Sequence, residues 1–416
     1  MNEGCVPTKT LLRSAEVMHL VKARAFEFGV RGVEPSAISF DLAAAVARKD
    51  TIVKGVIDGI YVALRRNKNI TFYAGRAEFT SAVEIRVNEV VIQADKTILA
   101  VGAQPAPAEI PGLKEAGYIT NYEALSLGKL PASLIIIGAG YVGVEFAQMY
   151  SRFGAKVTLI GRSSQVMPKE EPELSEILGE ILRAEGVDLH TSTEVIRVER
   201  QNGRRTVIPR RGDTEMRFEA EAILLAAGRI ARVDSLGLDQ TGVELDGFYL
   251  KADEQLRTTA SNIWSIGDAN GDHMFTHRAT YDGPIAALNA VRNLDKTVDY
   301  RVVPRAVFTE PALASVGLTE AQARDAGLEV KVGKAYFKHS GRAKALGQIE
   351  GLVKLVTDAK TNELLGGHIL GPHADILIHE VVAAMYNRGT IEAIAKSIHI
   401  HPTLPEVLKS AAKALG

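Results

Sequence analysis

The chain has 416 residues, of which 46% are hydrophobic and 24% are charged, and its net charge is −1. This length predicts about two or three domains with substantial cores, and the composition is ordinary for a soluble globular protein. The small net charge, without a long basic run, argues against binding to nucleic acid or an anionic membrane. No apolar run is long enough to span a bilayer. The single cysteine, Cys5, excludes an intrachain disulfide and a cysteine-built zinc site.

The N-terminus, MNEGCVPTK, contains no apolar signal-peptide core, so we expect a cytoplasmic protein. Pro7 suits a first helical turn, and a helix is predicted over Pro7–Phe26. Cys5 would then lie near a helix N-terminus with Lys9 one turn further on, an arrangement that favours a thiolate. The alternative is a small buried cysteine, the more common fate of a lone one.

The next segments predict a long helix followed by short strands. Asp41 is expected to cap a helix over Leu42–Arg65. The stretch Thr97–Pro105, TILAVGAQP, ends a strand in a turn at Gly102. The strands predicted after the helix are Val83–Val87, Val90–Gln93 and Thr97–Val101.

The stretch Leu134–Arg162, LIIIGAGYVGVEFAQMYSRFGAKVTLIGR, predicts a strand, a glycine turn, a helix and a second strand. Gly138, Gly140 and Gly143 follow the first strand with G-x-G-x-x-G spacing. In a βαβ unit that binds a dinucleotide, the first glycine makes the tight turn and the second lets the backbone approach the pyrophosphate. The third lets the helix pack on the sheet. We therefore predict a dinucleotide site here.

The end of the second strand indicates which nucleotide binds. An acid there would bind the ribose 2′-hydroxyl of NAD, whereas an arginine accommodates the 2′-phosphate of NADP. The chain continues Gly161-Arg162-Ser163-Ser164, without an acid. We therefore expect NADP(H) to be preferred over NAD(H). The alternative is that Arg162 is a solvated loop cation.

Two more predicted strands run into glycines in the second half of the chain. Ala222–Ala226 is followed by Gly228, and Asn262–Ile266 is followed by Gly267 and Asp268. From Arg301 onward strands precede helices, which predicts a separate α+β domain with an antiparallel sheet. The fold class is therefore α/β with a C-terminal α+β domain.

The segment His401–Glu406, HPTLPE, allows two interpretations. His401 with a carboxylate at Glu406 can form an oriented acid/base pair. Thr403 to Glu406 also has the pattern of a capping box with proline in the first turn, so Glu406 could simply cap the final helix. The residues alone leave both possibilities open.

Together these stretches resemble the FAD-dependent pyridine-nucleotide disulfide oxidoreductases over nearly the whole chain. The resemblance implies an FAD-binding domain over 1–127 and 246–300, an NAD(P)-binding domain over 128–245 and a C-terminal dimerisation domain over 301–416. Both nucleotide-binding domains would be Rossmann-like. The motifs that carry the resemblance occur in the family's order: Gly4–Lys9, Thr97–Pro105, Gly138–Glu145, Ala226–Arg229, Gly267-Asp268 and His401–Glu406.

The resemblance implies roles for the cysteine and for two pairs of charged residues. Cys5 is similar to the flavin-facing thiolate, and Lys9 is similar to the lysine near the flavin that pairs with a glutamate, here Glu145. His401, held by Glu406, is similar to the acid/base that serves the substrate thiol. In the family this histidine comes from the partner subunit, which implies a homodimer.

The resemblance also implies cofactor-binding residues outside the nucleotide helix. Gly102 and Gly228 lie in the corresponding cofactor-binding turns, and Asp268 is similar to the aspartate that bonds a ribityl hydroxyl of FAD. The alternative for Asp268 is the N-cap of the next helix.

Two departures from the family pattern stand out. The family motif is C-x-x-x-x-C, and its first cysteine would lie five positions before Cys5, at position zero. The family's N-terminal βαβ unit, which binds the ADP half of FAD, is also missing from the sequence. These departures suggest an N-terminal truncation, and we expect the chain as written to bind little FAD and to be a poor disulfide reductase.

The resemblance implies electron transfer from NADPH to FAD, to a redox-active cysteine pair, and on to a small or protein-bound disulfide. We expect a dihydrolipoyl dehydrogenase-like enzyme. A mercuric reductase is one alternative, since Gly161-Arg162-Ser163 is similar to the turn of that group. However, mercuric reductases end in a vicinal cysteine pair, whereas this chain ends LKSAAKALG. A non-catalytic dinucleotide-binding remnant is the other alternative.

Overall fold

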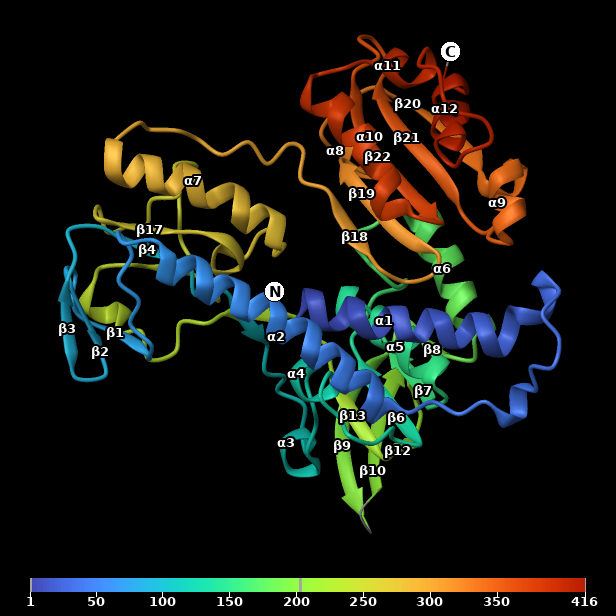
Figure 1. The fold of residues 1–416 in the computed structure, drawn as a ribbon, viewed down its shortest axis with the longest axis horizontal. Helices are drawn as coiled ribbons and strands as arrows, with labels where there is room; N and C mark the ends of the chain where they lie inside the picture. The colour runs from blue at the N-terminus through green and yellow to red at the C-terminus, as the bar shows by residue number, and fades with distance from the viewer. Residues whose placement is uncertain (1, 202–203, 416) are drawn as a thin grey trace. The chain divides into compact units, whose positions relative to one another are not determined.

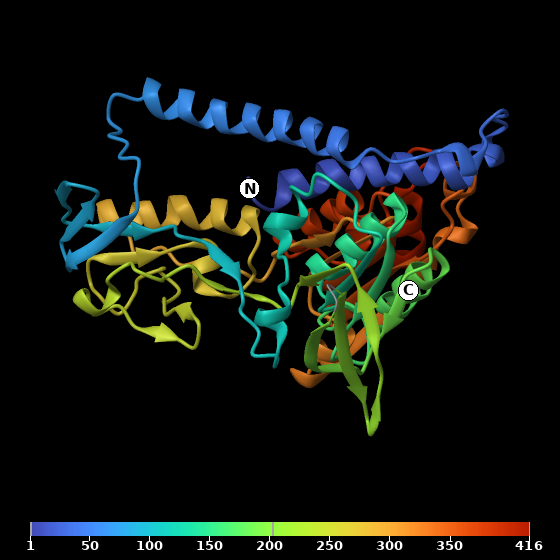
Figure 2. The same ribbon diagram turned by 90° about the horizontal axis from the view of Figure 1, so that it is seen from below.

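The computed structural model describes residues 2–201 and 204–415, which divide by their packing into two units. The first unit contains residues 54–107 and 228–303, and the second contains residues 2–53, 108–227 and 304–415. Helix α2 (Leu42–Arg66) begins in the second unit and ends in the first, and Figure 2 shows it as one long helix. Asp41 accepts a hydrogen bond from the Ala44 N–H at 2.9 Å, which confirms the predicted cap.

The second unit contains a parallel sheet in the order β13-β6-β7-β8. The apolar run before Gly138 forms its central strand because side chains on both faces are buried, and Leu134 and Ile136 are completely covered. A four-stranded antiparallel sheet lies between β8 and β13 in the sequence. The elements of this region are α3 (Leu113–Ala116), α4 (Asn121–Ala124), β6 (Ser133–Ile137), α5 (Tyr141–Phe153), β7 (Lys156–Ile160), α6 (Pro172–Ala184), β8 (Asp188–His190), β9 (Glu194–Gln201), β10 (Arg204–Arg211), β11 (Thr214–Glu215), β12 (Phe218–Ala220) and β13 (Ala222–Leu225).

The C-terminal part of the second unit is a five-stranded antiparallel sheet in the order β18-β19-β22-β21-β20, which confirms the predicted α+β arrangement. Helix α10 packs on β22 and β19, and helix α12 packs on β20 and β21 (Figure 1). The elements are β18 (Arg305–Val307), β19 (Ala312–Gly317), α8 (Glu320–Asp325), β20 (Val330–Tyr336), η6 (Phe337–His339), α9 (Gly341–Leu346), β21 (Leu352–Asp358), β22 (Leu364–Gly371), α10 (Ala374–Tyr386), α11 (Glu392–Ala395) and α12 (Pro405–Lys413).

Helix α1 (Cys5–His19) begins earlier and ends earlier than the sequence predicts. Its backbone continues as a π-helical turn, η1 (Leu20–Arg24), and a 3₁₀ turn, η2 (Ala25–Phe28). Leu11 and Ala15 lie in the core on the side of α1 that packs against α5. This packing places the start of α1 beside the helix that follows the glycine turn. A further 3₁₀ turn, η3 (Pro35–Ala37), precedes α2.

The first unit has its own core, around Phe79, Leu99 and Ile263. Strands β4 and β17 pair in parallel, and strands β5 and β14 pair antiparallel. None of the helices in the described residues has both the length and the apolar character needed to cross a bilayer. The elements of this unit are β1 (Ala77–Ser81), β2 (Glu84–Val87), β3 (Val90–Gln93), β4 (Thr97–Leu99), β5 (Ala103–Pro105), β14 (Arg229–Ala231), η4 (Leu238–Gln240), β15 (Leu245–Asp246), β16 (Tyr249–Leu250), β17 (Ile263–Ser265), η5 (Gly267–Asn270) and α7 (Thr276–Arg292).

Candidate functional site

The glycine turn between β6 and α5 has the geometry that a dinucleotide needs. A Cβ on Gly138 would lie 2.3 Å from the Ala226 carbonyl oxygen, and a Cβ on Gly143 would lie 1.8 Å from the Gly138 carbonyl oxygen. Only glycine therefore fits at these two positions. Around Gly140, in contrast, no heavy atom lies within 4 Å of the Cβ position, so the space above the turn is open.

The start of α5 supplies hydrogen-bond donors to that open space. The N-cap of α5 is Gly140, which has no side chain to cap the helix. The first backbone N–H groups of a helix have no intrahelical acceptors. Such a helix start attracts anions through its N–H groups and its dipole. The residues present therefore fit the pyrophosphate of a dinucleotide.

Arg162 lies just beyond β7, where its side chain is exposed. The backbone on both sides of it is fixed, because Gly161 accepts from the Thr193 N–H at 2.9 Å and Ser163 accepts from the Ser192 N–H at 2.7 Å. The exposed Arg162 thus belongs to an anchored segment, at the strand end that in dinucleotide-binding βαβ units lies near the ribose 2′ substituent.

Cys5 is the first residue of α1, and it is exposed. The alternative of a small buried cysteine is therefore wrong. One turn further on, the Lys9 ammonium donates to both carboxylate oxygens of Glu145 at 2.9 Å. The Lys9 side chain is 34% exposed and the Glu145 side chain 6%. The predicted Lys9–Glu145 pair is thus present, with one accessible partner and one nearly buried partner.

Phe308 is part of this site, although the sequence analysis did not identify it. Its backbone N–H donates to Glu145 Oε1 at 2.9 Å, and its ring centroid lies 4.4 Å from Lys9 Nζ, a cation–π contact. Phe308 and Glu145 are 163 positions apart in the chain, and no local pattern connects them. Only the packing of the C-terminal sheet region against α5 brings them together.

His401 and Glu406 do form a pair. His401 Nδ1 lies 2.9 Å from Glu406 Oε1, and the second carboxylate oxygen accepts from the Thr403 N–H at 2.9 Å. The Thr403 hydroxyl donates to the Ile400 carbonyl instead of capping the helix, so the reciprocal capping box is wrong. The hydrogen bond from Thr403 and the one with His401 lower the pKa of Glu406, which therefore stays ionised and orients the exposed imidazole.

The remaining predicted cofactor residues lie in the first unit. Gly102 and Gly228 both have positive φ values, of 69° and 130°, and nothing lies within 4 Å of the Cβ position on Gly102. Asp268 is half-buried within η5, whose N-cap is Ile266, so the N-cap alternative for Asp268 is wrong. Open glycine turns and a half-buried acid shortly after a strand are compatible with a flavin dinucleotide.

A buried acid supports the first residue of the nucleotide helix. The Tyr141 hydroxyl donates to Glu170 Oε1 at 2.6 Å, and Arg305 Nε donates to the same oxygen at 2.6 Å. Burial raises the pKa of Glu170, but the Arg305 guanidinium and the hydrogen bonds outweigh this and hold it below its ordinary value. Burial raises the pKa of Tyr141, and the ionised Glu170 carboxylate raises it further.

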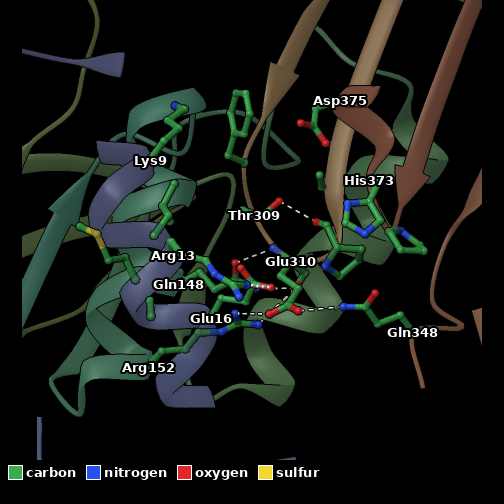
Figure 3. A pocket seen from close by; sticks show the side chains of 17 residues that line it. Lys9, Arg13, Glu16, Gln148, Arg152, Thr309, Glu310, Gln348, His373 and Asp375 are labelled. Atoms are coloured by element: carbon green, nitrogen blue, oxygen red, sulfur yellow. Dashed lines mark hydrogen bonds and ion pairs between the residues drawn. The ribbon is translucent and has the colours of Figure 1, made fainter. Parts of the chain in front are cut away.

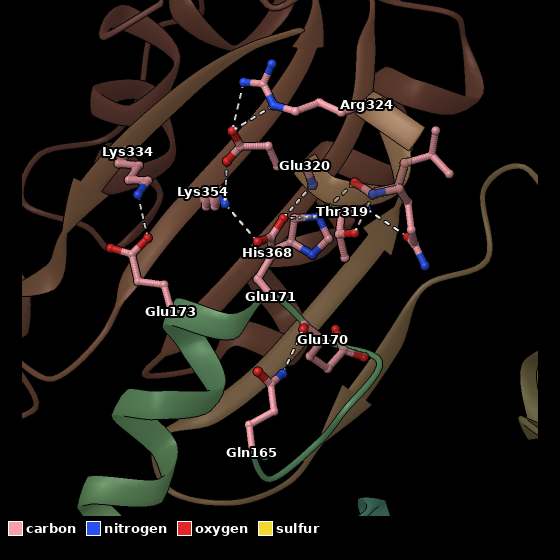
Figure 4. Close-up of polar contacts among 12 residues, drawn as sticks. Gln165, Glu170, Glu171, Glu173, Thr319, Glu320, Arg324, Lys334, Lys354 and His368 are labelled. Carbon is pink, nitrogen blue, oxygen red and sulfur yellow. Dashed lines mark hydrogen bonds and ion pairs between the residues drawn. The ribbon is translucent and has the colours of Figure 1, made fainter. Parts of the chain in front are cut away.

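The neighbouring acid, Glu171, belongs to a second buried network, which Figure 4 shows. It accepts from Lys354 at 2.7 Å and from the Glu320 N–H at 2.7 Å. His368 is completely buried 3.9 Å from Glu171, and its Nε2 lies 3.0 Å from the Leu318 carbonyl oxygen. Burial lowers the pKa of His368. Glu170 and Glu171 thus tie the segment before α6 to the C-terminal sheet.

Comparison with protein families gives two matches along the chain. Residues 1–283 match the family described as pyridine nucleotide-disulphide oxidoreductase, and residues 303–412 match its dimerisation domain. The second match supports a homodimer.

Curated proteins and solved structures agree with these matches. The chain is 38% identical over 422 residues to a dihydrolipoyl dehydrogenase of Chlorobaculum parvum, covering 100% of this chain and 88% of that protein. It is 35% identical over 412 residues to a mercuric reductase of Bacillus cereus, covering 99% of this chain and 65% of that protein. The flavoprotein disulfide reductase RclA from Escherichia coli has a TM-score of 0.87 at 29% identity, covering 100% of this chain and 91% of that chain.

These matches extend over the whole chain, and they do not support the expected N-terminal truncation. LpdA from Mycobacterium tuberculosis is also similar in structure, with a TM-score of 0.88 at 26% identity, covering 99% of this chain and 90% of that chain. The fold of the FAD-binding and dimerisation domains is therefore that of the disulfide reductases.

Proposed function

We propose that this chain, which belongs to the pyridine nucleotide-disulphide oxidoreductase family, uses NADPH to reduce a disulfide in the manner of a dihydrolipoyl dehydrogenase. The net reaction balances as NADPH, one proton and one disulfide giving NADP⁺ and two thiols. Cys5 is the only cysteine of the sequence, so its thiolate would attack the substrate disulfide, release one thiol and form a mixed disulfide. The electron pair of NADPH, which FAD would relay when bound, would then reduce this mixed disulfide to Cys5 and the second thiol. The expected domain limits, 1–127 with 246–300, 128–245 and 301–416, form part of this proposal.

One observation carries the proposal: a single helix serves both ends of the redox site. The first turn of α5 presents backbone N–H groups at the open glycine turn, and its second turn presents Glu145 to Lys9. Because α5 is rigid and largely buried, a nucleotide on its first turn would be held at a fixed distance from the ion pair.

Cys5 and Lys9 would supply the sulfur and the fixed charge. Cys5 lies at the N-terminus of a 15-residue helix, where the helix dipole favours an anion, and its exposure leaves the sulfur accessible. Lys9 would hold a positive charge near the flavin, and Glu145 with Phe308 would keep that charge in place.

His401 would handle the proton on the substrate side. With Nδ1 held by the ionised Glu406, its Nε2 would exchange a proton with a substrate thiol. His401 is 81% exposed in the single chain, which is compatible with a role at a site completed by the partner subunit.

Arg162 is the basis for proposing NADP(H) over NAD(H). Its exposed guanidinium follows the second strand of the βαβ unit, and the next two residues are serines rather than acids. An arginine and two hydroxyls would bind a 2′-phosphate through charge-assisted hydrogen bonds.

A substrate panel tests this function. The purified protein, reconstituted with FAD, is mixed with NADPH and with lipoamide or oxidised glutathione, and the loss of nicotinamide absorbance is followed. We expect acceptor-dependent oxidation of NADPH in the wild-type protein, slow because Cys5 is its only cysteine, and none in Cys5→Ser, which retains the nucleotide site. Equal rates in the two proteins would contradict a role for Cys5.

A mercuric reductase is the second candidate, favoured by the similarity to the Bacillus cereus protein and by the Gly161-Arg162-Ser163 turn. Hg(II) added to the same assay distinguishes the two. NADPH oxidation that depends on Hg(II) and not on disulfides would favour a mercuric reductase over a disulfide reductase.

A further inference from the structure

Helix α5 carries a buried polar stripe that continues beyond the residue paired with Lys9. Glu145, Gln148 and Arg152 lie on one side of the helix, at a spacing of three and four residues. Glu145 is 5% exposed, Gln148 is 2% exposed, and the Arg152 side chain is 5% exposed. Buried polar groups at this spacing require partners, and all three find them in the segment 308–310 between β18 and β19.

The side chain of Gln148 bonds the backbone of that segment. The Glu310 N–H donates to Gln148 Oε1 at 2.8 Å, and Gln148 Nε2 donates to the Glu310 carbonyl at 2.8 Å. Arg152 bonds the Glu310 carboxylate and is itself paired with Glu185 at 2.7 Å. Figure 3 shows Gln148 and Arg152 pointing from α5 toward Glu310.

Phe308, two residues before Glu310, connects this segment to the Lys9–Glu145 pair. The Phe308 N–H donates to Glu145, and its ring lies beneath the Lys9 ammonium. The orientation of the ion pair therefore depends on where the backbone of Phe308 lies.

The segment 308–310 is not packed on every side. Phe308, Thr309 and Glu310 line a cavity of about 190 Å³, together with Lys9 and Gln148 (Figure 3). A segment that borders an open space can shift by small amounts unless directional hydrogen bonds oppose the shift.

We propose that Gln148 is a positioning residue: its two hydrogen bonds to the Glu310 backbone fix Phe308, and Phe308 fixes the Lys9–Glu145 pair. The inference rests on the proposed function, in which that ion pair serves the redox site. The hydrogen bonds of the Gln148 side chain run to Glu310 and Glu185, not to Lys9 or the nucleotide turn.

The test compares two substitutions that remove equally sized amides. Gln148→Met keeps the volume and removes both backbone hydrogen bonds, together with the bond from Nε2 to Glu185 Oε1 at 3.2 Å. Gln348→Met is the matched control, because Gln348 Nε2 donates at 2.8 Å to the Glu310 carboxylate and leaves the backbone held. Gln148→Glu is the conservative variant. It keeps an acceptor for the Glu310 N–H but loses the donor to the Glu310 carbonyl and to Glu185, and its charge lies beside the cationic Arg152, which bonds both of those acceptors.

Amide hydrogen exchange at Phe308 is the first readout, and it requires no cofactor. We expect Gln148→Met to speed exchange at Phe308 by about tenfold, and Gln348→Met to leave it unchanged. Gln148→Glu should fall between Gln148→Met and wild type, and it also serves if Gln148→Met fails to fold. Wild-type protection of Phe308 in Gln148→Met, or in Gln148→Glu where only that variant folds, would overturn the proposal.

Steady-state kinetics is the second readout. Gln148→Met should lower kcat for NADPH-dependent disulfide reduction about tenfold while the KM for NADPH stays within about twofold, because the nucleotide turn is untouched. Equal losses in Gln148→Met and Gln348→Met would overturn the positioning role. If the wild-type protein reduces no disulfide, the proposed function fails, and hydrogen exchange alone decides whether Gln148 positions the ion pair.

Discussion

We predict that removing Lys9 destabilises the fold more than neutralising its partner, Glu145. Glu145 is nearly buried and accepts three hydrogen bonds, two from Lys9 and one from the Phe308 N–H. Lys9→Met would leave an ionised carboxylate in that site with a single neutral donor. Breaking a fully buried pair costs about 3–5 kcal/mol, and we take roughly half, about 2 kcal/mol, because water reaches the Lys9 side.

Glu145→Gln should cost less. The glutamine oxygen still accepts from the Phe308 N–H, no buried charge remains, and the one-third-exposed Lys9 ammonium can turn toward water. We expect a loss of about 1 kcal/mol, close to the value of one hydrogen bond. The double variant should lose less than the sum of the two single losses, because the pair is broken only once.

Urea unfolding followed by circular dichroism measures these differences in the free energy of unfolding. Lys396→Met is the matched control, since Lys396 and Glu392 form an ion pair at 2.6 Å with side chains 75% and 56% exposed. Such a pair is worth well under about 1 kcal/mol. The reasoning fails if Lys9→Met matches this control, or if Glu145→Gln is the more destabilising of the two substitutions.

Three further predictions concern the nucleotide turn, the choice of nucleotide and the response to pH. Gly140→Ala should fold normally, because its Cβ meets open space, yet bind NADPH at least about tenfold more weakly in titrations, whereas Gly143→Ala should be strongly destabilised by the close Gly138 carbonyl. Arg162→Glu should weaken NADPH binding about tenfold or more and leave NADH binding nearly unchanged, and equal losses for both nucleotides would contradict the 2′-phosphate role. His368 is held neutral by burial, so the stability tied to it is present above about pH 6.5 and is lost as pH falls and the unfolded chain binds the proton. The unfolding free energy of His368→Leu should therefore fall less steeply between about pH 6.5 and pH 5 than that of the wild type, by up to about 1.4 kcal/mol per pH unit.

The sequence predicted the elements of the site better than their connections. The glycine spacing at Gly138–Gly143 identified the turn because each glycine there answers a local steric demand. The partner of Lys9 was named from the family resemblance and was correct. Phe308 and Gln148 were not identified, because their roles depend on contacts between segments more than 150 positions apart, which no periodicity reports.

Local patterns also failed where two local interactions compete. The sequence of Thr403 to Glu406 fits a capping box, but the Thr403 hydroxyl bonds the Ile400 carbonyl and Glu406 turns one oxygen toward His401. Asp268 could have capped a helix, but the chain enters a 3₁₀ turn at Gly267 first. In both cases the residue types allow either hydrogen bond, and only the backbone path decides between them.

In the proposed function the ion pair and the nucleotide turn need a common support, and helix α5 would provide it. A positive charge would assist electron transfer only if its distance from the reacting atoms is fixed. A lysine side chain has four rotatable bonds, so it cannot fix the position of its own ammonium group. Glu145 restrains the Lys9 ammonium, but only if the Glu145 carboxylate is itself prevented from rotating. The Phe308 N–H would prevent that rotation, and Gln148, on the same helix that begins at the nucleotide turn, bonds the backbone of Glu310 two residues after Phe308. In the proposed function, the distance between nucleotide and charge would therefore be set by one helix, and a substitution two turns from the glycines should alter turnover without altering nucleotide affinity.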